Sequence, residues 1–123
     1  MGSFTVKEEE LIRLLSSMEI SRNVARTLVC LEAREECTSV ETEKLTGLRQ
    51  PEVSIAIQEL RDRGWVLKKD IKRSRKGRPV HSYRLARPFP DIIAAIDAGE
   101  KARIRKMEAA LGRLRYIIRK KGA

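Results

Sequence analysis

Aromatic residues are scarce in this sequence. Phenylalanine, tryptophan and tyrosine make up 4% of its 123 residues, whereas hydrophobic residues of all kinds make up 41%. Leucine, isoleucine and valine must therefore fill the core. At this length we expect one domain of ordinary size and one added element.

Cysteine and histidine are also few, with two cysteines and one histidine in the chain. Cys30 and Cys37 form neither a CxxC pair nor a Cys/His metal spacing. Without a secretion signal we expect free thiols rather than a disulfide, and Cys30 falls in an apolar stripe where a thiol acts as a small hydrophobic group. His81 lies in a predicted strand, which favours a partly covered structural role over a base or a ligand. The sequence predicts no metal site.

Several functional patterns are missing as well. No apolar run approaches the ~20 residues that cross a membrane, and the N-terminus lacks the basic start and apolar core of a signal peptide. There is no framework of paired carboxylates, no Ser/His/Asp or Cys/His arrangement, no P-loop and no Rossmann glycine pattern. We therefore expect a cytoplasmic protein that is not an enzyme, does not enter a membrane and has no cofactor.

Positive charge is present in excess, at a formal net of +10. Residues 1–60 hold 7 Lys/Arg and 11 Asp/Glu, a net of −4, whereas residues 61–87 hold 11 and 2, a net of +9. Residues 88–123 hold 9 and 4, a net of +5. A segmental bias of this kind is typical of proteins that bind phosphate groups. A generally basic composition would not account for the acidic first half.

The first half of the sequence predicts three short helices, over residues 7–18, 22–34 and 40–46, with a connector at 35–38. Ser21 and Ser39 stand at the N-cap positions of the second and third, where a hydroxyl accepts a backbone N–H. The apolar residues at helical spacing should face a common core. They are Leu11, Leu14, Leu15, Met18, Val24, Leu28, Leu31, Leu45 and Leu48.

A fourth helix follows a tight turn at Gly47 and begins at about Pro51. Proline suits the first helical turn because its missing N–H has no partner there. Gly64 stands where a residue in left-handed conformation ends a helix. One side of this helix is an apolar stripe, made of Val53, Ala56, Ile57 and Leu60.

The other side of the fourth helix carries mainly hydrogen-bonding side chains. They are Arg49, Gln50, Glu52, Ser54 and Gln58, with Ile55 among them. Such a face is typical of the second helix of a helix-turn-helix unit, and equally of an ordinary amphipathic surface helix. The segment that follows decides between the two interpretations.

After Gly64 the periodicity changes to that of a β-hairpin, with strands over residues 65–72 and 80–85 and a loop over 74–79. Tyr83 and Leu85 share one face and should close over the helices. The tip is built almost entirely of arginine, lysine, serine and glycine, so it must project into water or against an anion. Its cations are Arg73, Arg75, Lys76 and Arg78.

This order of elements resembles the winged-helix transcriptional regulators, most closely the compact prokaryotic and archaeal ones of the MarR, ArsR and TrmB type. The resemblance rests on LRDRGWV at 60–66, on KGRP at 76–79 and on YRL at 83–85, and it covers roughly 21–87. The metal cluster of metal-sensing ArsR relatives is absent from the sequence, which argues against metal sensing. The resemblance implies sequence-specific binding of double-stranded DNA by a homodimer.

By position, the resemblance implies that Arg49, Gln50, Glu52, Ser54 and Gln58 read the major groove. The side-chain chemistry agrees, because arginine pairs with guanine, glutamine with adenine and glutamate with the cytosine amino group. Ile55 either touches a thymine methyl or packs in the core. The wing contacts would be Arg73, Arg75, Lys76 and Arg78, on phosphates or a narrow minor groove. The alternative is a winged-helix module that docks proteins of the transcription or replication machinery and touches DNA weakly and nonspecifically.

The C-terminal segment predicts a long helix from Asp91 to about Lys121, with a possible interruption at 98–99. An apolar patch at Ile92, Ile93 and Ile96 precedes a coiled-coil seam that steps by 3, 4, 3 and 4 residues. The seam consists of Ile104, Met107, Leu111, Leu114 and Ile118. We expect it to pack against the same helix of a second copy, back on residues 11–18, or against both at once.

The expected fold class is therefore mainly α with a small β-hairpin. A winged helix-turn-helix domain with an added N-terminal helix should occupy residues 1–88. A long C-terminal dimerisation helix should occupy residues 89–123. The DNA sequence bound, the regulated genes and any small-molecule effector cannot be deduced from these patterns.

Overall fold

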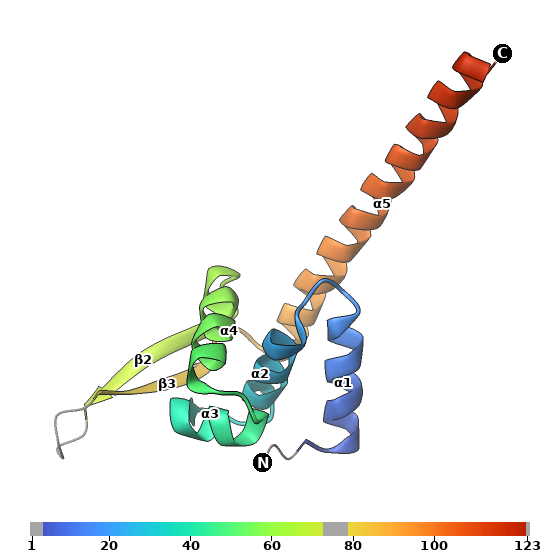
Figure 1. Ribbon diagram of the computed structural model, residues 1–123. Coiled ribbons are helices and arrows are strands. Elements are labelled where there is room, and N and C mark those ends of the chain that lie inside the picture. The colour runs from blue at the N-terminus through green and yellow to red at the C-terminus, as the bar shows by residue number, and fades with distance from the viewer. Residues whose placement is uncertain (1–3, 73–78, 123) are drawn as a thin grey trace. The chain divides into compact units, whose positions relative to one another are not determined.

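The computed structural model describes residues 4–72 and 79–122, which form five helices and one antiparallel three-stranded sheet (Figure 1). The expected fold class, mainly α with a small hairpin, is confirmed. The chain divides into two compact units, one ending at Phe89 and the other beginning at Pro90. The elements are α1 (Val6–Ser16), α2 (Arg22–Glu32), β1 (Cys37–Thr38), α3 (Ser39–Thr46), α4 (Gln50–Asp62), β2 (Val66–Lys72), β3 (Pro79–Leu85) and α5 (Phe89–Gly122).

The helix starts of the first unit are capped by side chains. At α1 the Thr5 hydroxyl accepts the Glu8 N–H at 3.1 Å, and the Glu8 carboxylate accepts the Thr5 N–H at 2.9 Å. Thr38 and Glu41 repeat this reciprocal arrangement at α3 with the same two distances. The prediction that Ser39 caps α3 was therefore wrong by one residue. Thr38 is the better cap because a glutamate follows three residues later and returns a second hydrogen bond.

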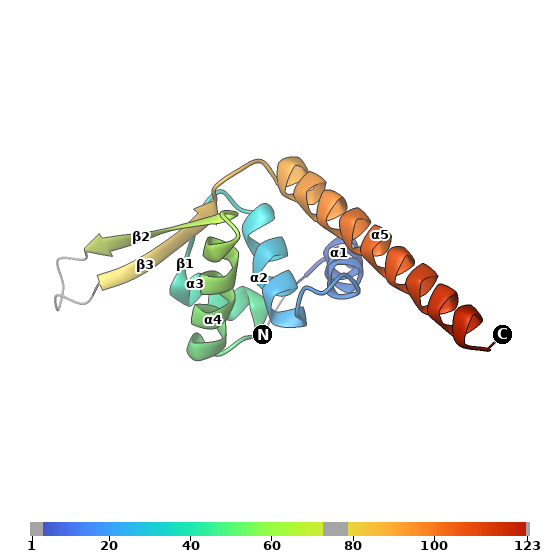
Figure 2. The same cartoon turned by 90° about the horizontal axis from the view of Figure 1, so that it is seen from above.

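The central helix of the first unit is α2, which lies between α1 on one side and α3 with α4 on the other (Figures 1 and 2). Its N-cap is Ser21, as predicted, and the Ser21 hydroxyl accepts the Val24 N–H at 3.2 Å. A helix covered on two sides must be apolar over most of its circumference. Its buried residues include all three predicted inward positions, Val24, Leu28 and Leu31.

The predicted apolar face of α1 is confirmed only at Leu15, and the observed face also includes Ile12. Ile12 and Leu15 are buried against the body, whereas Leu14 remains 52% exposed. Leu11 is only half-buried, and Met18 lies beyond the end of the helix. With leucines on several sides of a short helix, the sequence pattern does not indicate which side meets α2.

The anchors of α3 also differ from the prediction. Thr42 and Thr46 are fully buried, whereas Leu45 and Leu48 are half-buried. A buried hydroxyl needs a partner. Each threonine donates to a carbonyl one turn earlier, Thr42 to Thr38 at 2.8 Å and Thr46 to Thr42 at 2.6 Å. These hydroxyl–carbonyl bonds let two small polar residues take the buried positions of α3 that Leu45 and Leu48 were expected to take.

The sheet has the strand order β1-β3-β2. The β2–β3 hairpin runs in register from Val66 opposite Leu85 to Lys72 opposite Pro79. The two-residue strand β1 pairs Cys37 with Tyr83 on the other edge of β3 and was expected to be a connector. Tyr83 is buried as predicted, and Leu85 is half-buried.

The helix α5 is continuous over 34 residues, about 51 Å at 1.5 Å per residue. The possible interruption at 98–99 does not occur. Glycine costs roughly 1 kcal/mol inside a helix but keeps its backbone hydrogen bonds, so long flanking segments of good helix formers carry the helix through Gly99. Ile92 and Ile96 are buried, whereas Ile93 is 37% exposed. Among the described residues, no helix combines the length and the apolar character needed to cross a bilayer.

Candidate nucleic-acid interface

A short turn joins α3 to α4 and sets the orientation of α4. Gly47 ends α3 with a left-handed backbone, φ 74°, which glycine adopts without steric cost. The Leu48 N–H then donates to the Thr46 hydroxyl at 3.2 Å. The Arg49 N–H donates to the Glu52 carboxylate at 2.9 Å. Arginine has no acceptor to return this bond, so Glu52 alone completes the start of α4.

One face of α4 is covered by the body and the opposite face is open. Val53, Ala56, Ile57 and Leu60 are all buried, which confirms the predicted apolar stripe. The predicted reading residues Arg49, Gln50, Ser54 and Gln58 are exposed, and Glu52 is half-buried. Ile55 is 70% exposed, which excludes the core position that the sequence left open.

The side chains on the open face of α4 bind one another along the helix. The Gln50 Nε2 donates to the Ser54 hydroxyl at 2.9 Å, and the Gln58 Nε2 donates to the Asp62 carboxylate at 2.9 Å. Each bond joins residues one turn apart, so the carboxamides are aligned along the helix surface. Because Nε2 carries two hydrogens, each glutamine can keep this bond and still offer one donor and its oxygen to a partner.

The end of α4 leads directly into the hairpin. Gly64 has φ 77°, as predicted for the residue that ends the helix, and the Trp65 N–H donates to the Leu60 carbonyl at 3.0 Å. Trp65 is buried under the Arg63 guanidinium, whose carbon lies 5.0 Å from the ring centre. The buried ring therefore anchors the residue just before β2 to the end of α4.

The hairpin carries cations at its base. Lys68 and Lys69 are exposed on β2, and the Lys69 Nζ lies 3.7 Å from the Glu36 carboxylate. The Ser82 hydroxyl donates to the same carboxylate, and this hydrogen bond, more than Lys69, lowers the pKa of Glu36. His81 is half-buried, with its Nδ1 2.6 Å from the Asp70 carboxylate across the strands.

The predicted wing contacts cannot be located. Arg73, Arg75, Lys76 and Arg78 lie outside the described residues, which stop at 72 and resume at 79. The strands on either side of this segment, β2 and β3, pair in register up to Lys72 opposite Pro79.

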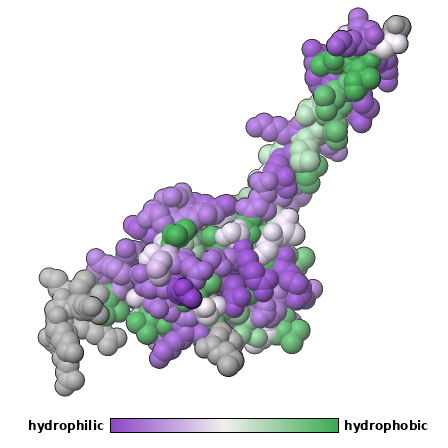
Figure 3. Space-filling model, viewed as in Figure 1, coloured by the Kyte–Doolittle hydropathy of each residue, from purple (hydrophilic) through white to green (hydrophobic). Residues whose placement is uncertain are grey.

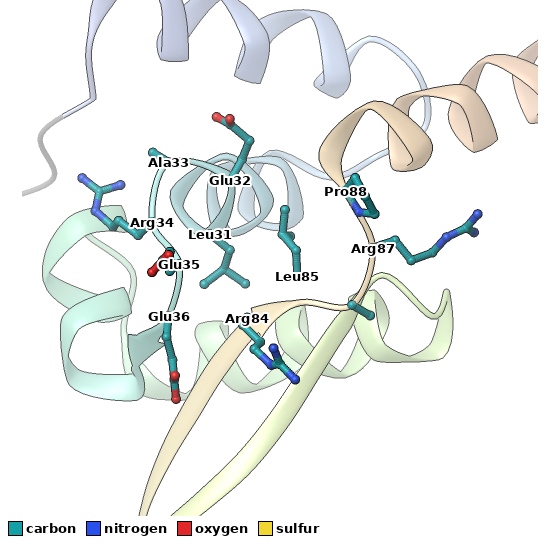
Figure 4. Close-up of a pocket in the computed structure, with 11 residues that line it drawn as sticks. Leu31, Glu32, Ala33, Arg34, Glu35, Glu36, Arg84, Leu85, Arg87 and Pro88 are labelled. Atoms are coloured by element: carbon teal, nitrogen blue, oxygen red, sulfur yellow. The ribbon is translucent and has the colours of Figure 1, made fainter.

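A hollow of about 670 Å³ lies between the end of α2 and the exit of β3 (Figure 4). Leu31 and Leu85 point towards each other in its middle, whereas Glu32 and Arg87 point away from it (Figure 4). Its rim carries both acidic and basic side chains. Since charges of one sign do not converge in the hollow, it is a weaker candidate for a charged ligand than the open face of α4.

The two thiols are buried and free. A hydrogen bond between them raises the pKa of Cys30 and lowers that of Cys37. Within the part of the chain that the structure describes, no group of three or more histidine, cysteine or acidic side chains is placed to hold a metal ion.

A second exposed surface lies on α5. The five predicted seam residues are open to solvent in the single chain, with exposed fractions from 50% for Leu111 to 67% for Ile118. Hydrophobic residues accordingly run along the visible surface of this helix in Figure 3. A row of large apolar side chains at heptad spacing is typical of a helix that packs against another helix.

No protein-family model matches this sequence, and no curated protein is significantly similar to it. Solved structures are similar in fold. TrmBL2, an archaeal chromatin protein, has a TM-score of 0.64 and 18% identity over 91% of this chain, which spans 40% of TrmBL2. A MarR family transcriptional regulator from Silicibacter pomeroyi has a TM-score of 0.53 and 20% identity, over 93% of this chain and 80% of that one. BpsR from Bordetella bronchiseptica has a TM-score of 0.51 and 15% identity, over 94% of this chain and 92% of BpsR.

At identities of 15% to 20%, these similarities establish the fold alone. The resemblance to winged-helix regulators, inferred from short segments of sequence, is confirmed at this level. The candidate interface therefore consists of the open face of α4 and the base of the hairpin on a winged helix-turn-helix scaffold.

Proposed function

We propose that this chain is a transcriptional regulator that binds specific sequences of double-stranded DNA as a homodimer. The observation that carries the proposal is the open face of α4, where hydrogen-bonding side chains stand exposed directly after a tight turn. In the winged-helix fold this helix enters the major groove. Two similar structures support the proposal, since TrmBL2 is described as binding DNA and BpsR as having its DNA binding regulated by 6-hydroxynicotinic acid.

The open face of α4 supplies direct readout. Gln50 and Gln58 each offer a donor and an acceptor, which matches the major-groove edge of adenine. Arg49 stands at the N-cap, within reach of either a guanine or a phosphate. Ser54 adds a hydroxyl beside Gln50. Glu52 uses one carboxylate oxygen on the Arg49 N–H and keeps the other for a cytosine amino group.

Ile55 supplies apolar readout on the same face. It is the single aliphatic residue exposed among the polar ones there, at 70%, and Pro51 precedes it by one turn. A branched aliphatic side chain in the major groove contacts the methyl group of thymine. We therefore assign Ile55 to a thymine beside the base that Gln58 reads.

The hairpin supplies sequence-independent contacts. Arg73, Arg75, Lys76 and Arg78 would meet phosphates or a narrow minor groove beside the major groove that α4 occupies. Such contacts fix the position of α4 on the duplex and add affinity more than specificity. The strand register is compatible with this role, because Lys72 and Pro79, which flank this segment in the sequence, pair at the end of the hairpin farthest from Trp65.

The homodimer would form through the seam of α5, made of Ile104, Met107, Leu111, Leu114 and Ile118. Two reading helices enter successive major grooves on one face of DNA when they lie about 34–36 Å apart. A single winged-helix unit does not set that distance. The exposure of all five seam residues supports a second copy of α5 as their partner.

Selection of bound duplexes from a random pool tests the proposal. We expect a palindromic consensus with half-sites about 10 base pairs apart. Gln58→Ala should relax one or two positions of each half-site, whereas Glu10→Ala, an exposed control on α1, should leave the consensus unchanged. Absence of any enrichment would instead favour a winged-helix module that docks proteins.

A further inference from the structure

The side of α5 opposite the seam carries a second pattern. At 100° per residue, five cations and one tyrosine fall within about 80° of the line opposite the seam. We call this set the basic face. It consists of Arg105, Lys106, Arg113, Tyr116, Arg119 and Lys120, all exposed.

The basic face has no acidic residue of its own. The last carboxylates of α5 are Glu100 and Glu108. At 100° per residue, Glu100 lies on the line of the seam and Glu108 lies about 100° from the centre of the basic face. Within the described residues, the ion pairs of α5 involve Lys101 and Arg103, and none joins a cation of the basic face to a carboxylate. Intramolecular pairing therefore leaves the charge of this face uncompensated.

The aromatic ring of the basic face lies among its cations. The Arg113 guanidinium carbon lies 5.4 Å from the centre of the Tyr116 ring, and the Lys120 ammonium lies 5.8 Å from it. Cation–π contact places two positive groups around one ring. Small residues, Ala109 and Gly112, lie beside them, and a Cβ built at Gly112 meets nothing within 4 Å. Ile117, 44% exposed, lies at the margin of the face, one turn from Arg113 and Lys120. The middle of the face is thus a strip of cations around one tyrosine.

We infer that the basic face of α5 binds the phosphate backbone of double-stranded DNA without regard to sequence. From Arg105 to Lys120 the strip is about 22 Å long at 1.5 Å per residue. DNA presents one phosphate for roughly every 1.7 Å of its axis, so several phosphates lie within the length of the strip. The face has arginine and lysine but no glutamine or asparagine, which suits phosphates rather than base edges.

An anionic membrane is the main alternative partner for a basic helix. A membrane-bound helix inserts its apolar side between the lipids. On α5 the apolar side is the seam, which the proposed homodimer covers. The choice of DNA over a membrane therefore rests on the proposed function. The charge pattern of the basic face is independent of that proposal.

Neutralisation of the strip tests the inference. The variant Arg113→Gln/Arg119→Gln/Lys120→Gln and the matched control Lys7→Gln/Arg13→Gln/Arg22→Gln each remove three exposed charges from the full chain. The probe is a labelled duplex of random sequence, followed by fluorescence anisotropy over a series of salt concentrations. We expect the variant to bind at least about tenfold more weakly at roughly 0.1 M salt. Its log affinity–log salt slope should fall by about 0.9 for each phosphate that the variant no longer binds, whereas the control keeps the slope.

Further measurements distinguish a phosphate contact from a structural effect and from membrane binding. Arg113→Lys/Arg119→Lys retains the charge and should keep the slope, so a reduced slope there would overturn a phosphate contact made by charge. A slope of the neutralised variant equal to that of the control would overturn the inference. Loss of binding to phosphatidylserine vesicles with unchanged DNA binding would also overturn it, in favour of a membrane. The proposed function and the inference can fail separately. If Gln58→Ala relaxes the selected DNA sequence while the neutralised variant keeps its log affinity–log salt slope, the proposed function stands and the inference fails.

Discussion

The substitution Leu111→Glu tests the proposed dimer at the middle of the seam. The five seam residues are 50% to 67% exposed in the single chain, so about half of each side chain remains to be buried. Full burial of such a side chain contributes about 1.5–3 kcal/mol, and half of it about 1 kcal/mol. Ten seam residues in a dimer would then contribute about 10 kcal/mol. Association costs at least about 4 kcal/mol of that, which leaves a dimer of modest stability.

A single substitution counts twice in a symmetric dimer. Leu111→Glu removes two half-buried leucines, about 2 kcal/mol in total, and places two carboxylates in an apolar seam at a cost of several kcal/mol more. At 1.4 kcal/mol per tenfold, the dissociation constant of the dimer should rise by at least about a thousandfold. A wild-type dimer held by about 6 kcal/mol has a dissociation constant of about 40 μM, so light scattering at about 0.5 mM protein should show a wild-type dimer and a Leu111→Glu monomer. Affinity for the selected DNA site should fall close to the level of random DNA.

The control for this experiment is Ala102→Glu, which adds the same charge to an exposed position of α5 away from the seam. This variant should remain a dimer. Circular dichroism should show that both variants keep their helices. A Leu111→Glu protein that stays dimeric would place the interface elsewhere, with residues 11–18 the next candidate. A protein that unfolds outright would show that α5 is needed for the fold of its own subunit.

Four other outcomes are expected. Arg75→Ala/Lys76→Ala should weaken binding to all duplexes similarly and lower the salt slope by about one unit for each phosphate released, measured by anisotropy. Gln50→Ala should relax one or two base pairs of the selected site, at roughly 1–3 kcal/mol per bidentate contact. Replacing each thymine of that site by uracil should weaken the wild type at one position but not Ile55→Ala, and an equal effect on both proteins would remove Ile55 from the interface. Thr38→Ala should lower the free energy of unfolding by about 1 kcal/mol in thermal or urea melts, because α3 loses its cap.

The helix α4 could be predicted closely because its signals are local. Pro51 lies in its first turn, Gly64 follows its end, and the apolar stripe between them has a single helical period. The open face follows from the same stripe, since a residue opposite a buried position on a surface helix is exposed. The exposure of Ile55 could not be predicted in this way. An apolar residue at the margin of a stripe is compatible with both the core and the solvent-exposed face until the packing is known.

Other features depend on tertiary contacts that leave little trace in the sequence. The strand β1 is two residues long, too short for any periodicity, and exists because Cys37 pairs with Tyr83. The burial of Thr42 and Thr46 depends on hydroxyl bonds to the preceding turn, whereas a hydrophobicity pattern selects leucine. The proposed wing contacts rest on residue type and order in the sequence alone, because the cations between residues 73 and 78 lie outside the described residues.

The acidic and basic halves of the chain differ in what the fold does with their charges. Three acids, Glu8, Glu41 and Glu52, each occupy the third position of a helix. Each accepts the backbone N–H of the residue just before that helix at 2.9 Å. A carboxylate there also interacts favourably with the helix dipole. These three acids of the first half thus each have a role in folding, whether or not a ligand is bound. Arg119 and Lys120 of the basic face interact in the same way with the dipole at the end of α5, in whose last turn they lie. Arg105, Lys106 and Arg113 lie before that turn, and within the described residues no ion pair joins them to a carboxylate. Folding therefore accounts for these three acids, whereas the proposed binding of DNA phosphates supplies a physical reason to retain the cations at positions 105, 106 and 113.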